Sequence, residues 1–184
     1  MSVDNKGNIN DREAAENWQS NKSQYPNLDV LVQPDEYMLA RLPPTLRLPT
    51  PLLELISNPP AVEGSEPLFC TVSRTHRELS ILVSTGTHFS ATKLRSQLGS
   101  PGPEDEADGF GIDGPWRAFR IRGPMQFHLV GVLLEFSKCL AAHSISIFAV
   151  STWDTDYICV KQDNFDAACD ALKQDGWNVV HAAD

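Results

Sequence analysis

The residues best suited to bind a small polar ligand lie at one short corner of the chain, between two apolar runs. Thr152 and Trp153 end the first run, and Asp154 and Asp156 precede the second. Together they offer a hydroxyl, an indole and carboxylates, which can form hydrogen bonds and attract a cation such as an ammonium group. The corner therefore has the chemistry of a docking place for a small polar ligand.

Each residue of the corner also has a purely structural interpretation. Asp154 is typical of tight turns, in which the side chain bonds to nearby backbone, and we favour that role for it. Asp156 begins a strand, where a carboxylate is poorly suited, so a functional role is favoured. Trp153 is compatible either with ligand contact or with covering the end of a sheet.

The sequence indicates no catalytic machinery. His143 is interpreted as a residue at the C-terminal end of a helix, and no Ser or Cys lies at a spacing typical of a catalytic triad. A literal G-x-G-x-x-G stands at Gly109, Gly111 and Gly114, but an acidic loop precedes it and a predicted strand follows it. A dinucleotide fingerprint needs a strand before it and a helix after it. We therefore predict a protein that is not an enzyme and has no cofactor.

The composition excludes several classes of protein. The chain of 184 residues carries a formal net charge of −9, which argues against nucleic acid or an anionic membrane as a partner. No apolar run approaches the roughly 18 residues of a membrane span, and the polar N-terminus lacks the apolar core of a signal peptide. We therefore expect a cytoplasmic protein. None of the four cysteines forms a C-x-x-C pair, so disulfides and a metal site are disfavoured.

The sequence on either side of the corner predicts the strands and helices that position it. Residues Ser144–Val160 predict two strands, the first of them central in its sheet because it is apolar on both faces. Trp116–Arg122 predicts the preceding strand and Gln126–His143 the longest helix. A helix capped by Asp163 and ended by Gly176 follows, and Trp177–His181 predicts a last strand.

Gly131 lies inside the predicted long helix, where glycine costs about 1 kcal/mol relative to alanine. A close approach of backbone or ligand would explain it, and so would small-residue packing against the sheet. Both interpretations stay open at the level of the sequence.

The first half of the chain repeats the same order of elements. Glu36–Leu42 predicts a strand, Pro49–Ser57 a short helix, Leu68–Ser73 and Glu78–Thr85 a hairpin, and His88–Leu98 a second helix. We therefore predict an α+β protein of two tandem ferredoxin-like βαββαβ units, antiparallel sheets with helices on one face. The predicted parts are a flexible N-terminal tail (1–33), a first, degenerate unit (34–98), an acidic flexible loop (99–114) and a second unit (115–184).

The second half also resembles a known family. The run S-I-S-I-F-A-V-S-T-W-D-T-D-Y-I-C-V, preceded by W-R-A-F-R-I-R-G-P-M-x-F-x-L-x-G-V-L, resembles the ACT-domain proteins related to the CASTOR arginine sensors and to aspartokinase regulatory domains. The likeness covers about Asp35–Val180. It implies paired ACT units that bind a free amino acid at the interface between units and so regulate another activity.

The resemblance also implies where the ligand would lie. A helix N-terminus would attract its α-carboxylate, and Asp156 would pair with its α-amino group or a basic side chain. The arginine sensors carry an acidic residue where Leu129 stands here, so a guanidinium would have one partner fewer. The implied ligand residues are Met125, Gln126, Leu129 and Val132 on one side, Thr152, Trp153 and Asp156 on another, and His143, Ser146 and Ile147 from a facing unit.

Two functions therefore follow from the sequence. The first is a regulatory or sensor protein that binds a small molecule, expected to be a free amino acid. It would form a homodimer and regulate a protein partner. The alternative is a protein-interaction module whose ligand pocket is vestigial.

Overall fold

The chain divides into two compact units that are not consecutive in the sequence. Unit 1 consists of Met1–Pro34 and Arg117–Asp184, and unit 2 of Asp35–Trp116. Strands β1 (Val30–Leu42) and β4 (Gly111–Ile121) contribute residues to both units. The computed structural model describes residues 18, 22–57, 69–85, 90–98, 109–125 and 130–181.

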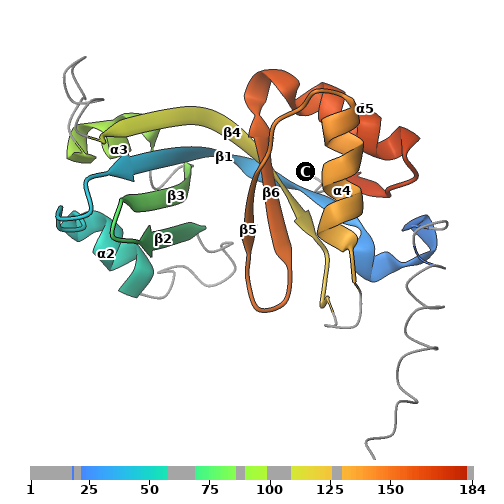
Figure 1. The fold of residues 1–184 in the computed structure, drawn as a ribbon, viewed down its shortest axis with the longest axis horizontal. Helices are drawn as coiled ribbons and strands as arrows, with labels where there is room; N and C mark the ends of the chain where they lie inside the picture. The colour runs from blue at the N-terminus through green and yellow to red at the C-terminus, as the bar shows by residue number, and fades with distance from the viewer. Residues whose placement is uncertain are drawn as a thin grey trace, which may run out of the picture. The chain divides into compact units, whose positions relative to one another are not determined.

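Unit 2 has the element order β-α-β-β-α-β. The C-terminal part of β1 is followed by α2 (Thr50–Ser57), the hairpin β2 (Cys70–Arg74) and β3 (Leu79–Thr85), α3 (Ala91–Leu98) and the N-terminal part of β4. The strands lie in the order β2-β3-β1-β4, with antiparallel pairing of β3 to both β1 and β2 (Figure 1).

The core of unit 2 follows from alternation along its strands. Every second residue of β1 and β3 points to one face of the sheet, and the apolar residues of α2 and α3 cover that face. The buried residues are Met38, Ala40, Leu42, Leu52, Leu79, Ile81, Val83, Leu94 and Leu98.

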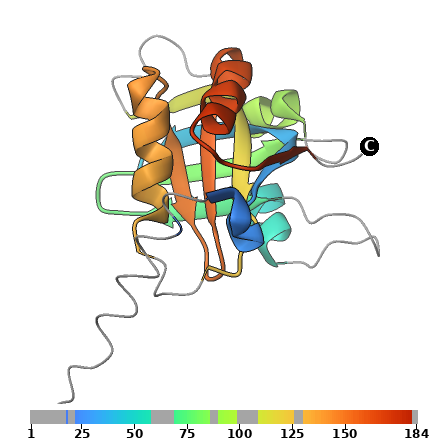
Figure 2. The same ribbon diagram turned by 90° about the vertical axis from the view of Figure 1, so that its right-hand side faces the viewer.

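Unit 1 is built around the strand order β7-β1-β4-β6-β5. The 3-10 helices η1 (Lys22–Gln24) and η2 (Pro26–Leu28) lead into β1, and β4 leads into α4 (Val132–Ala142). Figure 2 shows that α4 and α5 cover the same face of the strands. The remaining elements are β5 (Phe148–Ser151), β6 (Asp156–Lys161), η3 (Gln162–Asn164), α5 (Phe165–Gln174) and β7 (Val179–His181).

Aromatic rings hold the helices of unit 1 on their sheet. Phe119 of β4 stacks on Phe165 of α5, with ring centroids 5.2 Å apart, and lies 6.0 Å from Phe136 of α4. Trp177 meets Phe136 edge to face at 5.4 Å. Such pairs each add about 1 kcal/mol to the free energy gained by burying their area. The α+β class and the antiparallel sheet with helices are as predicted. No helix in the described part of the chain is both long enough and apolar enough to cross a membrane.

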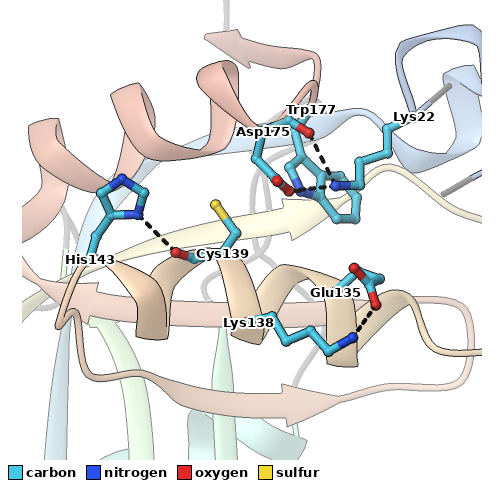
Figure 3. Close-up of polar contacts among 7 residues, drawn as sticks. All are labelled: Lys22, Glu135, Lys138, Cys139, His143, Asp175 and Trp177. Atoms are coloured by element: carbon cyan, nitrogen blue, oxygen red, sulfur yellow. Dashed lines mark hydrogen bonds and ion pairs between the residues drawn. The ribbon is translucent and has the colours of Figure 1, made fainter. Parts of the chain in front are cut away.

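The prediction of a flexible N-terminal tail is wrong for its last part. Trp18 is fully buried, residues Lys22–Leu28 form η1 and η2, and β1 begins at Val30 rather than Glu36. Figure 3 shows Lys22 meeting Asp175 and the ring of Trp177. The polar composition hid these contacts, because only single apolar residues such as Trp18, Leu28 and Val30 carry this segment into the core of unit 1.

The predicted central strand is also wrong. β5 starts only at Phe148 and lies at one end of the strand order, whereas β6 is internal. Ile145 and Ile147, which suggested a strand apolar on both faces, precede β5 and pack into the core of unit 1.

Three further boundaries differ from the sequence prediction. Residues Gly111–Gly114 of the predicted acidic loop belong to β4, and residues 99–108 lie outside the described part of the chain. Asp163 lies in η3 instead of capping α5. The second unit is not self-contained: β1 lies between β4 and β7, and β7 pairs with β1 in parallel. The predicted hairpin and the helix ending at Ser57 are confirmed.

The burial of Trp18 gives a direct test of the N-terminal segment. Trp18→Ala is expected to lower the free energy of unfolding by about 3–5 kcal/mol, because it leaves a large cavity in the core. Trp153→Ala is the matched control, since Trp153 is 82% exposed, and should change stability by less than about 0.5 kcal/mol. Urea unfolding measures both, and equal losses would contradict the assignment.

Candidate functional site

The corner Thr152–Asp156 is a tight turn closed by its own threonines. The backbone N–H of Thr152 donates to the carbonyl of Thr155 at 2.8 Å, and the Thr152 hydroxyl donates to the same oxygen at 2.9 Å. Ser151 and Asp156 are the last paired residues of the β5–β6 ladder. The turn therefore has a fixed shape, set by hydrogen bonds that the sequence places within four residues.

The corner is bonded to the loop that leaves β4. The N–H of Met125 donates to the carbonyl of Asp154 at 2.8 Å, and the buried Thr155 hydroxyl donates to the carbonyl of Ile121. Gly123 lies between these bonds with φ +72°, and a Cβ on it would come within 2.8 Å of the Asp154 carbonyl oxygen. Only glycine combines that backbone angle with so close an approach.

The same loop is bonded on its other side to the segment before β1. The N–H of Arg122 donates to the carbonyl of Asp29 at 2.8 Å, and the N–H of Gly123 donates to that of Asn27 at 2.9 Å. The amides of Arg122, Gly123 and Met125 are thus all used within the protein. They are not available to hold a ligand carboxylate.

Asp156 is the unusual residue of the corner. It is 8% exposed and alternates in phase with Ile158 and Val160, which lie in the core under the helices. Its carboxylate has no hydrogen bond or ion pair with any residue that the structure describes. The neighbouring carboxylate of Asp154 is exposed, in keeping with a turn residue.

The N-terminal end of α4 lies at the same end of unit 1 as the corner, as Figures 1 and 2 show. The predicted helix from Gln126 is wrong at its start: α4 begins at Val132 behind Gly131, whose φ of 88° is left-handed. No side chain caps this helix. Its first N–H groups carry the positive end of the helix dipole, which suits an anion.

Large apolar side chains are exposed around this end. Val130 is 68% exposed, Leu134 56% and Trp153 82%. Soluble proteins commonly expose single apolar residues, whereas exposed apolar side chains that form one continuous patch mark contact surfaces.

The structure brings only part of the predicted set to this end. Thr152 and Trp153 are exposed there, Asp156 is buried, Met125 is half-buried against the core, and Val132 is 4% exposed within it. Gln126 and Leu129 lie outside the described residues.

The residues predicted to come from a facing unit lie at the other end of α4. His143 follows the helix, and its Nδ1 lies 2.9 Å from the carbonyl oxygen of Cys139 (Figure 3). Ser146 is exposed, and Ile147 packs against the core. Because α4 has eleven residues and spans about 16 Å, these side chains cannot line the same pocket as Asp156 within one unit.

Sequence reasoning missed Asn27, Asp29 and Thr155 as residues that shape the site. Asn27 and Asp29 are about ninety residues from the loop that they bond, and their backbone carbonyls carry no sequence signal. Thr155 could have been found, since a threonine between two aspartates at a strand start is a frequent turn former.

The described groups give no sign of thiol or metal chemistry. All four cysteines are free, and burial raises the pKa of Cys159 to about 12 and those of Cys70 and Cys139 to about 11. These side chains are protonated thiols at neutral pH, which are poor nucleophiles. Among the described residues, no group of His, Cys, Asp and Glu could hold a metal ion.

Gly123 offers a test of the geometry of the loop. Gly123→Ala should destabilise the protein by about 3 kcal/mol, because it adds a steric clash to the strain of a left-handed backbone. Gly176→Ala is the matched control: Gly176 has φ +87° but no atom within 4 Å of the added Cβ, so a loss of about 1 kcal/mol is expected. Equal losses in thermal unfolding would show that the loop does not approach the corner.

Comparisons with known proteins place this geometry in a fold. Residues 112–174 match the family model described as ACT domain. A solved structure from Agobacterium tumefaciens is 24% identical, with a TM-score of 0.58, covering 85% of this chain and 94% of its own. A Vibrio cholerae protein described as a possible transport protein is 14% identical, with a TM-score of 0.52 and coverage of 85% and 97%.

A regulatory subunit gives the same result. The ligand-free regulatory subunit of aspartate kinase from Thermus thermophilus is 10% identical, with a TM-score of 0.50, covering 79% of this chain and 96% of its own. None of the curated proteins matches the sequence. The chain thus contains an ACT-domain match and shares its fold with the regulatory subunit of aspartate kinase from Thermus thermophilus.

Proposed function

We propose that this protein is a regulatory sensor without catalytic activity, and that unit 1 binds a free amino acid at the corner Thr152–Asp156. The observation that carries the proposal is Asp156, a residue that is 8% exposed and whose carboxylate has no hydrogen bond or ion pair with the described residues. A ligand ammonium group would give this carboxylate a charged hydrogen-bond partner.

The carboxylate end of the ligand would lie at the start of α4. The amides of Arg122, Gly123 and Met125 are bonded within the protein, so among the described residues the first turn of α4 would supply the backbone donors for this carboxylate. An amino acid carries an ammonium and a carboxylate on one carbon, so it suits a buried carboxylate near an uncapped helix N-terminus. Thr152 and Trp153 would contact its side chain.

Unit 2 supports the choice of unit 1. We propose that unit 2 is a second, degenerate ACT-like unit, since its elements follow the same βαββαβ order. The guanidinium of Arg74, at its corresponding corner, donates to the carbonyls of Pro44 and Leu46, the latter at 2.8 Å. The Arg74 side chain thus lies against the loop after β1, at the place in unit 2 that corresponds to the proposed ligand site of unit 1.

The comparisons support a regulatory role. The aspartate kinase regulatory subunit has this fold, and the resemblance to CASTOR sensors points to amino acids as ligands. We include in the proposal a cytoplasmic homodimer, in which the partner's residues matching His143, Ser146 and Ile147 complete the site, and a regulated protein partner.

A protein-interaction module is the alternative, favoured by the exposed apolar side chains of Val130, Leu134 and Trp153. On this reading they form a contact surface for another protein, and the ligand site is vestigial. The two functions differ in whether any free amino acid stabilises the chain.

Thermal unfolding in the presence of each of the twenty amino acids tests the proposal. One or a few amino acids are expected to raise Tm progressively as their concentration increases. At a ligand concentration of a hundred times Kd, the free energy of unfolding should rise by about 2.7 kcal/mol. Asp156→Asn should abolish this response, whereas Asp154→Asn, an exposed neighbour, should keep it. A screen in which no amino acid stabilises the wild-type chain would leave the interaction module as the better reading.

The ligand-free protein gives a second prediction with the opposite sign. Asp156→Asn removes the charge of a largely covered residue that no described residue pairs with, so it should raise stability by up to about 1 kcal/mol, or about 2–4 °C in Tm for a chain of this size. If Asp156 instead serves the fold, the same substitution lowers Tm. Calorimetry without ligand distinguishes the two.

A further inference from the structure

Asp29 joins three segments of unit 1 at one buried point. It is 7% exposed. Its Oδ2 accepts a hydrogen bond from Nε of Arg122 at 3.1 Å and pairs with Nη2 of the same guanidinium at 3.0 Å. Its Oδ1 accepts from Nδ2 of Asn178 at 2.8 Å. Both carboxylate oxygens are therefore satisfied, in contrast to those of Asp156.

The backbone around Asp29 makes the same connections. Its carbonyl accepts from the N–H of Arg122, the carbonyl of Asn27 accepts from Gly123, and the N–H of Val30 donates to the carbonyl of Asn178. The first residues of the loop after β4 are therefore held by side-chain and backbone bonds to the segment before β1. The next residues of that loop are bonded to the corner, through Met125 and Asp154.

The segment Lys22–Asp29, here named the N-terminal strap, has a second anchor at its other end. Nζ of Lys22 pairs with the carboxylate of Asp175, donates to its carbonyl at 3.1 Å and lies 5.2 Å from the ring centroid of Trp177 (Figure 3). Trp177 donates to the same Asp175 carboxylate at 3.1 Å. The strap is thus fixed at both ends, and among the described residues its Asn27–Asp29 end is bonded to the loop beside the corner.

We propose that Asp29 is a positioning residue for the ligand corner, and that the N-terminal strap is coupled to ligand binding through it. The inference rests on the proposed function for its ligand, but its structural half stands without one. The first residues of the loop are hydrogen-bonded to Asp29 and Asn27, and Met125 is hydrogen-bonded to Asp154. Loosening one end lets the loop move, which displaces the corner that Asp156 borders.

Coupling of this kind is reciprocal. If the position of the strap sets the affinity of the corner, ligand binding must hold the strap more firmly by the same factor. The strap and loop belong to the same compact unit, so no rearrangement of the two units is needed.

Hydrogen exchange at single amides tests the structural half on the full chain without ligand. Asp29→Asn keeps the shape of the side chain but removes the charge that pairs with Arg122. We expect the amides of Arg122, Gly123 and Met125 to exchange about tenfold faster, relative to the internal strand amides of Ile158 and Val160. The Met125 amide is the decisive one, because it bonds to the corner and not to the strap.

Asp175→Asn is the matched control, since it weakens an ion pair at the far end of the strap. It should leave the exchange ratio of Met125 unchanged. A merely structural role for Asp29 would raise exchange at the reference amides of Ile158 and Val160 as much as at the loop amides, or would raise Met125 exchange equally in both variants. Either result overturns the proposal.

The ligand half uses the amino acid that most stabilises the wild-type chain, with its affinity measured by calorimetry. Asp29→Asn should weaken binding about tenfold, and the ligand should slow exchange of the Gly123 amide in the wild-type chain. If Asp29→Asn speeds exchange of the Met125 amide but leaves the affinity for the amino acid unchanged, the proposed coupling is wrong. If no amino acid binds, the proposed function fails, while the exchange experiment still decides whether Asp29 positions the corner.

Discussion

The structure of the candidate site depends on one short stretch of backbone, residues 122–125, whose N–H groups are bonded in two directions. Arg122 and Gly123 donate to carbonyls before β1, and Met125 donates to the carbonyl of Asp154 in the corner. Such bonds contribute only about 1 kcal/mol each, but together they tie the loop to both neighbouring segments. The segment before β1, the end of β4 and the β5–β6 corner therefore hold one another in place. Gly123 permits it, because a side chain there would collide with the Asp154 carbonyl.

Two buried aspartates of unit 1, Asp29 and Asp156, differ in how their carboxylates are bonded. Asp29 is fully hydrogen-bonded to Arg122 and Asn178, so its charge contributes to the fold. Asp156 has no such partner among the described residues, so its carboxylate adds no hydrogen bond to the fold.

The pairing of strands shows how the two compact units share the chain. β1 supplies its first residues to unit 1 and its last to unit 2, and β4 does the reverse. In unit 1 the start of β1 lies between β4 and β7, so residues from the N-terminal segment become part of the sheet that carries the corner. Removing that segment would take out Trp18, Leu28 and Val30 from the core together with the acceptors of Arg122 and Gly123.

The sequence by itself determined what depends on neighbours along the chain. The alternation in Leu79–Val83, the helix at Thr50–Ser57, the hairpin before and after Arg74 and the polar character of Thr152–Asp156 all follow from local patterns. Tertiary structure alone decided the rest: that β5 is an edge strand, that Trp18 and Lys22 are buried, and that Asp29 supports the loop. The physical reason is that the bonds of Lys22 and Asp29 join residues 93 to 153 positions apart, in which backbone carbonyls and single charges act without any periodic signal. The corner could therefore be found from its residue types, but which of its carboxylates is buried without a partner could be known only from the fold.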